Sequence, residues 1–134
     1  MKQEPEHVKI GFLGEDIACR FLQGKGYFVS ERNYRKKQGE IDIIAKKGSN
    51  IHFFEVKTVS CEIREDNVNH ETNEGYRPED NMHSFKLKRL SNTISIFLLE
   101  RNLEDINWTF NVVTVLLDRK NKKAKVSLLE DLTL

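Results

Sequence analysis

Two short segments of the sequence place acids and a lysine at a spacing that suits metal-dependent cleavage of a phosphodiester. Asp42 lies in GEIDIIA (39–45), whereas Glu55 and Lys57 lie in HFFEVKT (52–58). Carboxylates hold divalent cations, and a nearby ammonium group orients an attacking water or stabilises developing negative charge. We therefore predict that these three side chains converge on one site.

Both segments alternate polar and apolar residues, which predicts the two strands of one hairpin. In the second strand Glu55 and Lys57 share a face, because side chains alternate between the faces of a strand. The intervening KKGSN (46–50) favours a short turn. A symmetric turn pairs residues whose numbers sum to 97, so Asp42 would face Glu55 and Glu40 would face Lys57. Two carboxylates directly opposite each other on neighbouring strands repel, and they require a cation or a proton between them.

The same alternation also describes an ordinary half-exposed strand. If residues 39–45 form a strand, Glu40, Asp42 and Ile44 lie on one face and Ile41 and Ile43 on the other. A shift of the strand register by one residue would reverse these faces. A second acid-x-Lys match, DRK at 118–120, lies in a polar stretch that is typical of a turn.

Size and composition favour one globular domain over residues 1–134. The chain is 38% hydrophobic and 32% charged, which is an ordinary composition for a soluble domain. The N-terminal residues lack the apolar core of a signal peptide, and no apolar run is long enough to span a membrane. We read Cys19 and Cys61 as free thiols and expect a cytoplasmic protein without a membrane partner. The irregular spacing of the Cys and His residues argues against a zinc site.

Charge is distributed unevenly along the chain. From Ser60 to His83 there are seven acids and two arginines, a net of −5, so that the remainder carries +6 of the overall +1. This acidic insertion (about 60–83) has little apolar periodicity and is predicted to be a long, mobile loop. It would either restrict access of phosphates to the basic remainder or be a tolerated insertion.

Apolar periodicity predicts two helices and several strands. The expected elements are a helix over His7–Gly24, a strand over Tyr27–Tyr34, a basic turn over Arg35–Gln38, the two strands of the hairpin, a helix N-capped by Ser84 with Leu87, Leu90, Ile94, Phe97 and Leu98 as its buried stripe, a buried strand over Trp108–Leu117 and an edge strand over Val126–Leu129. This order, α-β-β-β-α-β(-β), predicts an α/β fold with a mixed sheet covered by helices.

Several strings resemble the YraN-like family of predicted endonucleases, which belongs to the PD-(D/E)xK nuclease superfamily. They are GEDIACRFLQGKGYFVSERNYR (14–35), GEIDIIA, FFEVKT and KLKRL (86–90), and they cover most of the chain in the same order. The resemblance implies a restriction-endonuclease-like three-layer fold, with a central mixed sheet flanked by helices. Among the departures from the family pattern, Asn111 stands where the late strand often carries an acid.

The resemblance also implies roles for individual residues. Asp42, Glu55 and the Val56 carbonyl would bind Mg²⁺ or Mn²⁺, Lys57 would be the catalytic lysine, and Glu15 would be an additional acid that completes the metal shell. Two further residues, Gln38 and Glu40, are expected to lie next to these ligands and to support them without contacting the metal. Basic residues expected to contact DNA are Arg35, Lys36, Lys37, Lys86, Lys88 and Arg89.

Two functions remain open from the sequence. The first is a metal-dependent DNA endonuclease that acts in repair or recombination, with branched or flapped DNA as candidate substrates. The second is a non-catalytic nucleic-acid-binding or structural protein on a nuclease fold. Junction-cutting members of the superfamily commonly act as dimers, so a homodimer is also open.

Overall fold

The computed structural model describes residues 4–63 and 84–134. Along the chain the elements are α1 (Glu6–Gly24), β1 (Phe28–Lys36), β2 (Gly39–Lys47), β3 (Asn50–Ser60), α2 (Ser84–Glu100), β4 (Trp108–Asp118) and β5 (Lys123–Leu129). This is the predicted order, including the closing strand. Most of the acidic insertion, and with it the prediction of a mobile loop, lies outside the described residues.

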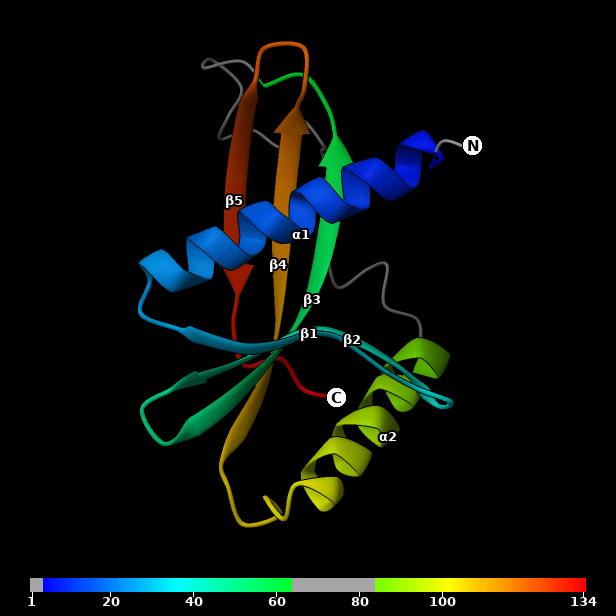
Figure 1. The fold of residues 1–134 in the computed structure, drawn as a ribbon, viewed down its shortest axis with the longest axis vertical. Helices are drawn as coiled ribbons and strands as arrows, with labels where there is room; N and C mark the ends of the chain where they lie inside the picture. Colours follow the sequence, from blue (N-terminus) through cyan, green and yellow to red (C-terminus); the bar gives the residue numbers. More distant parts are fainter. Residues whose placement is uncertain (1–3, 64–83) are drawn as a thin grey trace.

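The five strands form one mixed sheet in the order β1-β2-β3-β4-β5 (Figure 1). Only β3 and β4 are parallel, and the other neighbours are antiparallel. Parallel neighbours need a crossover connection, and here α2 lies in that connection. The mixed sheet with two helices is consistent with the predicted restriction-endonuclease-like fold.

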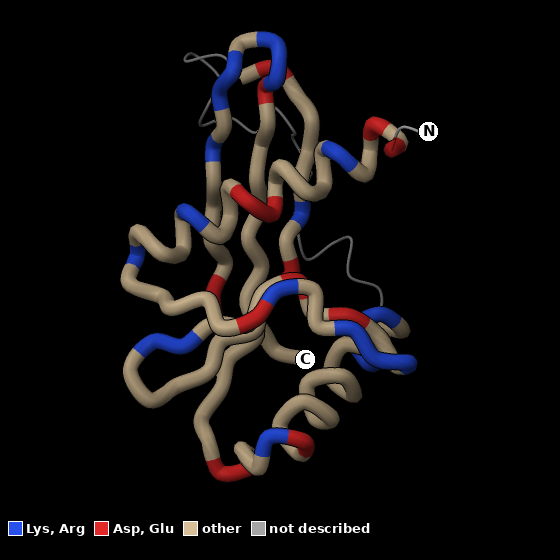
Figure 2. Tube along the Cα trace, in the orientation of Figure 1, with Lys and Arg blue, Asp and Glu red and all other residues tan. Residues whose placement is uncertain are grey.

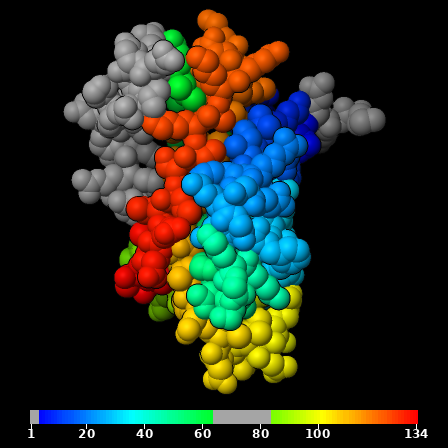
Figure 3. All heavy atoms as spheres, turned by 90° about the vertical axis from the view of Figure 1, so that its left-hand side faces the viewer, coloured from blue at the N-terminus to red at the C-terminus, as the bar shows by residue number. Residues whose placement is uncertain are grey.

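The two helices cover opposite faces of the sheet. Consecutive residues of β3 separate into two cores: Phe53 packs in the cluster that contains Ile94 and Phe97 of α2, whereas Phe54 packs with Leu22 of α1. The apolar stripe of α2 is therefore used in the core of this chain. In the side view of Figure 3, α1 (blue) lies directly beside β5 (orange-red), whose Val126 and Leu128 pack against the same core cluster as Leu22.

The end of α1 is fixed by a glycine. Gly26 has φ of +94°, and its N–H donates to the Gln23 carbonyl while the Tyr27 N–H donates to the Leu22 carbonyl. These two bonds form a Schellman motif, which only a residue tolerant of positive φ allows without strain. Leu22 and Tyr27 then pack in the same core cluster, so the motif leads the chain directly into β1.

Three predicted boundaries need correction. β1 continues through Arg35 and Lys36, which pair with Glu40 and Gly39, so that the turn shrinks to residues 37–38. The predicted N-cap Ser84 is the first residue of α2 itself. β5 begins earlier than predicted, at Lys123, because the turn after β4 is short. For the two strands, polar residues that are typical of a turn adopt strand conformation because they pair with the neighbouring strand.

β2 and β3 separate at the point where the candidate acids lie. Their pairing runs from Lys47↔Asn50 to Ile43↔Phe54 in the predicted register and then stops. Beyond that point β2 continues to pair with β1 alone, and β3 with β4 alone. We call this separation the fork. Asp42 and Glu55 are the first residues beyond it on their two strands.

The backbone of β2 changes face at the fork. Ile41 packs with Ile44 in the core beneath α2, whereas Ile43 packs in the core beneath α1. The prediction that Ile41 and Ile43 share a face is therefore wrong, because regular alternation is lost where β2 leaves its neighbour. Within the described helices, none combines the length and apolar character that spanning a membrane requires.

Candidate active site

Asp42 and Glu55 lie together at the fork, where each strand has lost its partner. The Asp42 Oδ2 atom accepts a hydrogen bond of 2.8 Å from the Val56 N–H, which satisfies a backbone donor that β2 no longer reaches. Burial, together with the nearby Glu55 carboxylate, raises the pKa of Asp42 to about 8. The two acids therefore form an electrostatically coupled pair that favours binding a proton or a cation.

Two lysines contact Glu55, which is only 9% exposed. Lys86 Nζ lies 2.9 Å from Glu55 Oε1, and Lys57 Nζ lies 3.9 Å from the same atom. Burial and the neighbouring Lys86 lower the pKa of Lys57. Although burial acts against it, the hydrogen bond to Glu55 raises the pKa of Lys86. Lys86 was expected to contact DNA, and here it serves as the counter-ion of a buried acid.

Gly14 sets the position of α1 against β3. A Cβ atom added at Gly14 would lie 1.9 Å from the Thr58 Oγ1 atom, so only glycine permits this approach. The next residue, Glu15, is thereby held at the sheet with 9% of its surface exposed. The helix thus brings a third acid to the cleft beside the fork.

Glu15 is held by two residues of β1 that the sequence did not indicate. Its Oε1 atom accepts hydrogen bonds from Asn33 Nδ2 at 3.0 Å and from Arg32 Nη2 at 3.1 Å. Asn33 adopts φ of +52°, a left-handed conformation that asparagine tolerates better than most residues. Positive φ inside a strand leaves no trace in the period-two pattern, so this contact could not be predicted.

Of the two residues expected to support the acids, Gln38 lies in the β1–β2 turn and Glu40 near the start of β2. Glu40 forms an ion pair of 2.7 Å with Arg35, its cross-strand partner on β1. The predicted pairing of Glu40 with Lys57 is therefore wrong. Gln38 is exposed in the turn, and its carbonyl accepts a hydrogen bond of 3.2 Å from Arg89.

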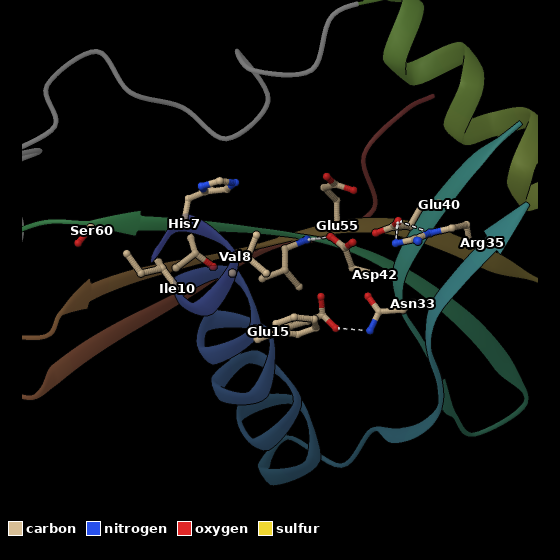
Figure 4. A pocket seen from close by; sticks show the side chains of 14 residues that line it. His7, Val8, Ile10, Glu15, Asn33, Arg35, Glu40, Asp42, Glu55 and Ser60 are labelled. Atoms are coloured by element: carbon tan, nitrogen blue, oxygen red, sulfur yellow. Dashed lines mark hydrogen bonds and ion pairs between the residues drawn. The ribbon is translucent and has the colours of Figure 1, made fainter. Parts of the chain in front are cut away.

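The acids line two adjoining cavities. The larger, of about 760 Å³, lies between α1 and the fork and is lined by Glu15, Glu40, Asp42 and Glu55 among others (Figure 4). The smaller, of about 310 Å³, is lined by Glu40, Asp42 and Glu55 together with residues of α2. The acids at the fork therefore line both cavities, one on the side of α1 and one on the side of α2.

The donor set suits a hard divalent cation. Carboxylate and carbonyl oxygens are the ligands that Mg²⁺ prefers, and two carboxylates are enough because Mg²⁺ keeps several waters. The mutual repulsion of Asp42 and Glu55 is the expected signature of such a pair. In the conformation seen here, no three Asp, Glu, His or Cys side chains within residues 4–63 and 84–134 are grouped to hold one metal ion. Glu15 is bonded to β1 and Glu55 to Lys86 instead.

Most of the basic residues expected to contact DNA lie around the β1–β2 turn and the start of α2, at one side of the molecule. The β1–β2 turn lies beside the start of α2, where Arg89 donates to the Gln38 carbonyl (Figure 2). Lys37 and Lys88 are exposed there, whereas Lys36 forms an ion pair of 2.7 Å with Glu100. We call Arg35, Lys36, Lys37, Lys88 and Arg89 the basic rim.

Two other polar residues have structural roles. Asp118 accepts hydrogen bonds from the N–H groups of Ile63 and Asn121, so the second acid-x-Lys match stabilises the turn between β4 and β5. Asn111, where the family often carries an acid, is buried and bonds the Phe53 carbonyl and the Asp131 N–H. It fixes the C-terminal segment to the sheet.

The fold is consistent with the restriction-endonuclease-like class that the sequence resemblance indicated. Residues 14–115 match the model of a family described as "Uncharacterised protein family UPF0102". A UPF0102 protein of Clostridium kluyveri is 34% identical over 122 residues, which are 91% of each chain. A UPF0102 protein of Campylobacter hominis is 36% identical over 129 residues, or 96% of this chain and 97% of the relative. The chain belongs to the UPF0102 family, the YraN-like family of predicted endonucleases in the PD-(D/E)xK superfamily.

Proposed function

We propose that this protein is a metal-dependent endonuclease that hydrolyses phosphodiester bonds of DNA. The observation that carries the proposal is the fork, where Asp42 and Glu55 meet and Lys57 lies 3.9 Å from Glu55. Membership of a family of predicted endonucleases supports the same function. A role in repair or recombination, with branched or flapped DNA as substrate, is part of the proposal.

The residues at the fork would divide the chemistry among them. When bound, Mg²⁺ or Mn²⁺ supplies a Lewis acid that polarises the scissile phosphate and lowers the pKa of a water. Asp42, Glu55 and the Val56 carbonyl would hold the cation, and Glu15 would complete its shell directly or through water. Lys57, whose pKa is lowered by burial, would orient the attacking water or stabilise negative charge on the phosphate. The basic rim would hold the flanking phosphates.

Cleavage assays with matched variants test the proposal. We expect the wild type to cut at least one of linear, flapped and four-way-junction DNA in Mg²⁺ or Mn²⁺, and Asp42→Asn and Lys57→Ala to lower the rate by about 100-fold or more. Lys46→Ala, an exposed lysine of β2 away from the fork, is the control. An enzymatic role would be rejected if the wild type cuts no DNA, or if the Asp42 and Lys57 variants cut as fast as the wild type.

A second function is favoured by the bonds that the acids already make. Glu15 is paired with Arg32 and Glu55 with Lys86, so each of these acids has a basic partner that is not a metal ion. A non-catalytic nucleic-acid-binding protein on a nuclease fold would keep these pairs. Salt-sensitive DNA binding, with no cutting and no heat of Mn²⁺ binding in calorimetry, would support this alternative.

A further inference from the structure

The larger cavity has an apolar wall that metal-dependent hydrolysis does not require. On α1 the residues that line it include Val8, Gly11, Phe12 and Glu15. These positions are three or four residues apart and therefore share one face of the helix. The cavity thus has carboxylates at the fork and an aromatic ring about one helical turn from Glu15.

Phe12 is exposed although it faces this cavity. Its side chain is 52% exposed, and it belongs to neither of the two core clusters. At the preceding residue, a Cβ atom added to Gly11 would meet no atom within 4 Å, so the absence of a side chain there is not demanded by packing. With no side chain at Gly11 and an exposed ring at Phe12, this face of α1 leaves room for a ligand beside the ring.

Charged groups complete the cavity around this wall. Arg35, whose side chain is 73% exposed, lines the cavity on the side of β1, and His7 lines it at the first turn of α1. Figure 4 shows His7 and Arg35 at opposite ends of the site, with Asp42 and Glu55 between them. A nucleotide has the matching chemistry, because its phosphate suits the basic group and the acids with their cation, whereas its base suits the ring.

The base that meets Phe12 cannot be one held in a double helix. Paired bases are stacked on each other, and their faces become available only when a strand is single or a nucleotide is flipped out. A cavity of about 760 Å³ has the size of pockets that enclose single ligands, roughly 300–1,000 Å³. It is suited to a nucleotide rather than to a whole duplex.

We propose that Phe12 stacks on an unpaired base next to the scissile phosphate, so that the protein prefers single-stranded, flapped or frayed DNA to fully paired duplex. The proposal rests on the proposed function, because it assigns the substrate class of the same site. Phe12 would set specificity, while Asp42, Glu55 and Lys57 carry the chemistry.

Binding measurements test this inference separately from cleavage. The full chain carrying Asp42→Asn, which is not expected to cut, is titrated into a labelled single strand and into the matching blunt duplex, with fluorescence anisotropy as the signal. Phe12→Ala should weaken single-strand binding by about 5- to 150-fold and leave duplex binding unchanged. Phe12→Trp should retain binding, because the larger ring still stacks.

Leu13→Ala is the matched control. Leu13 is the next residue of α1, is 42% exposed, and lines a different cavity beside the β4–β5 turn. It should change neither affinity, and melting curves of the variants establish that they are folded. If Phe12→Ala leaves single-strand binding unchanged, or weakens single strand and duplex equally, the stacking proposal is wrong.

Wild-type cleavage separates the two proposals. If no DNA is cut but single-strand binding depends on Phe12, the nuclease proposal fails and the stacking proposal holds. If blunt duplex is cut as fast as flapped DNA, and Phe12→Ala cuts both normally, the nuclease proposal holds and the stacking proposal fails.

Discussion

At the scale of single residues, Asp42 lies in surroundings that favour its neutral form. Burial and the Glu55 carboxylate raise its pKa from the ordinary 3.8 to about 8. Between these values the native state keeps a proton that the unfolded chain releases, so the free energy of unfolding falls as pH rises from about 4 to about 8. We expect Asp42→Asn to remove this fall and to raise the free energy of unfolding at neutral pH by about 1–3 kcal/mol.

Denaturant unfolding at a series of pH values measures the effect. Asp105→Asn, which changes an exposed acid outside the site, should keep the wild-type dependence. If wild type and Asp42→Asn lose stability in parallel as pH rises, Asp42 is not the responsible group.

Lys86 and a divalent cation would compete for the same oxygen. Lys86 Nζ lies 2.9 Å from Glu55 Oε1, so a cation bound to that atom must displace the ammonium group. Lys86→Met should therefore lower stability in a chelator by about 1 kcal/mol, because Glu55 loses its counter-ion. The same variant should gain more thermal stability from Mn²⁺ than the wild type gains.

The shift of melting temperature between chelator and Mn²⁺ is the measurement. Lys88→Met, an exposed lysine on the same helix, should respond to Mn²⁺ as the wild type does. Identical shifts in Lys86→Met and wild type would contradict competition at Glu55.

At the scale of elements, the closest contact between α1 and the sheet is at Gly14. Alanine is the better helix former, yet its Cβ would lie 1.9 Å from Thr58 Oγ1. We expect Gly14→Ala to lower the free energy of unfolding by about 1–3 kcal/mol through overpacking. Thr58→Ala in the same chain should restore part of the loss.

Gly11→Ala is the control for Gly14→Ala. Its Cβ would meet nothing within 4 Å, so it should raise stability by about 0.5–1 kcal/mol through helix propensity alone. Denaturant unfolding measures the free energy of unfolding of Gly14→Ala, of Gly14→Ala combined with Thr58→Ala, and of Gly11→Ala. Equal gains in Gly14→Ala and Gly11→Ala would show that α1 does not press against β3.

The elements differ in how far the sequence determines them. The hairpin of β2 and β3 could be predicted, with its register from Lys47↔Asn50 to Ile43↔Phe54, because its turn is short. The predicted pairs Asp42↔Glu55 and Glu40↔Lys57 lie beyond the end of this pairing and are not formed. The extension of β1 through Arg35 and Lys36 could not, since their polar side chains are typical of a turn and their strand conformation comes from pairing with β2.

The same division holds for the site. Asp42 and Glu55 are not paired across the strands as predicted, but each is the next residue after the last pair, Ile43↔Phe54, so their proximity still follows from the hairpin register. Glu15 reaches the cleft through a helix–sheet contact at Gly14, which no local pattern encodes, and only the family resemblance indicated it. The bond between Lys86 and Glu55 depends on the crossover that brings α2 to β3, and it could not be read from spacing.

At the scale of the whole molecule, the small net charge of +1 conceals local clusters of basic residues, one of which is the basic rim. The basic rim joins the β1–β2 turn to the start of α2, whereas Lys120 lies in the turn at the far end of β4. We expect Lys37→Ala and Lys88→Ala each to weaken DNA binding without regard to sequence and to reduce the salt slope by about 1.

Affinity measured at several salt concentrations checks this placement. Lys120→Ala, also an exposed lysine, is the matched control and should keep the wild-type slope. A reduced slope in Lys120→Ala alone would place DNA at the β4–β5 turn and not at the basic rim.

The fork also bears on self-association. Beyond Phe54, β3 has no strand partner on the β2 side among the described strands, so it presents an edge to which another strand could add. Asp42 takes the Val56 N–H of that edge, and Glu15 and Glu55 place charge beside it. Inward-pointing charge is a common defence against strand addition. The carboxylates that we assign to chemistry would therefore also keep the molecules apart, and neutralising all three would favour edge-to-edge aggregation.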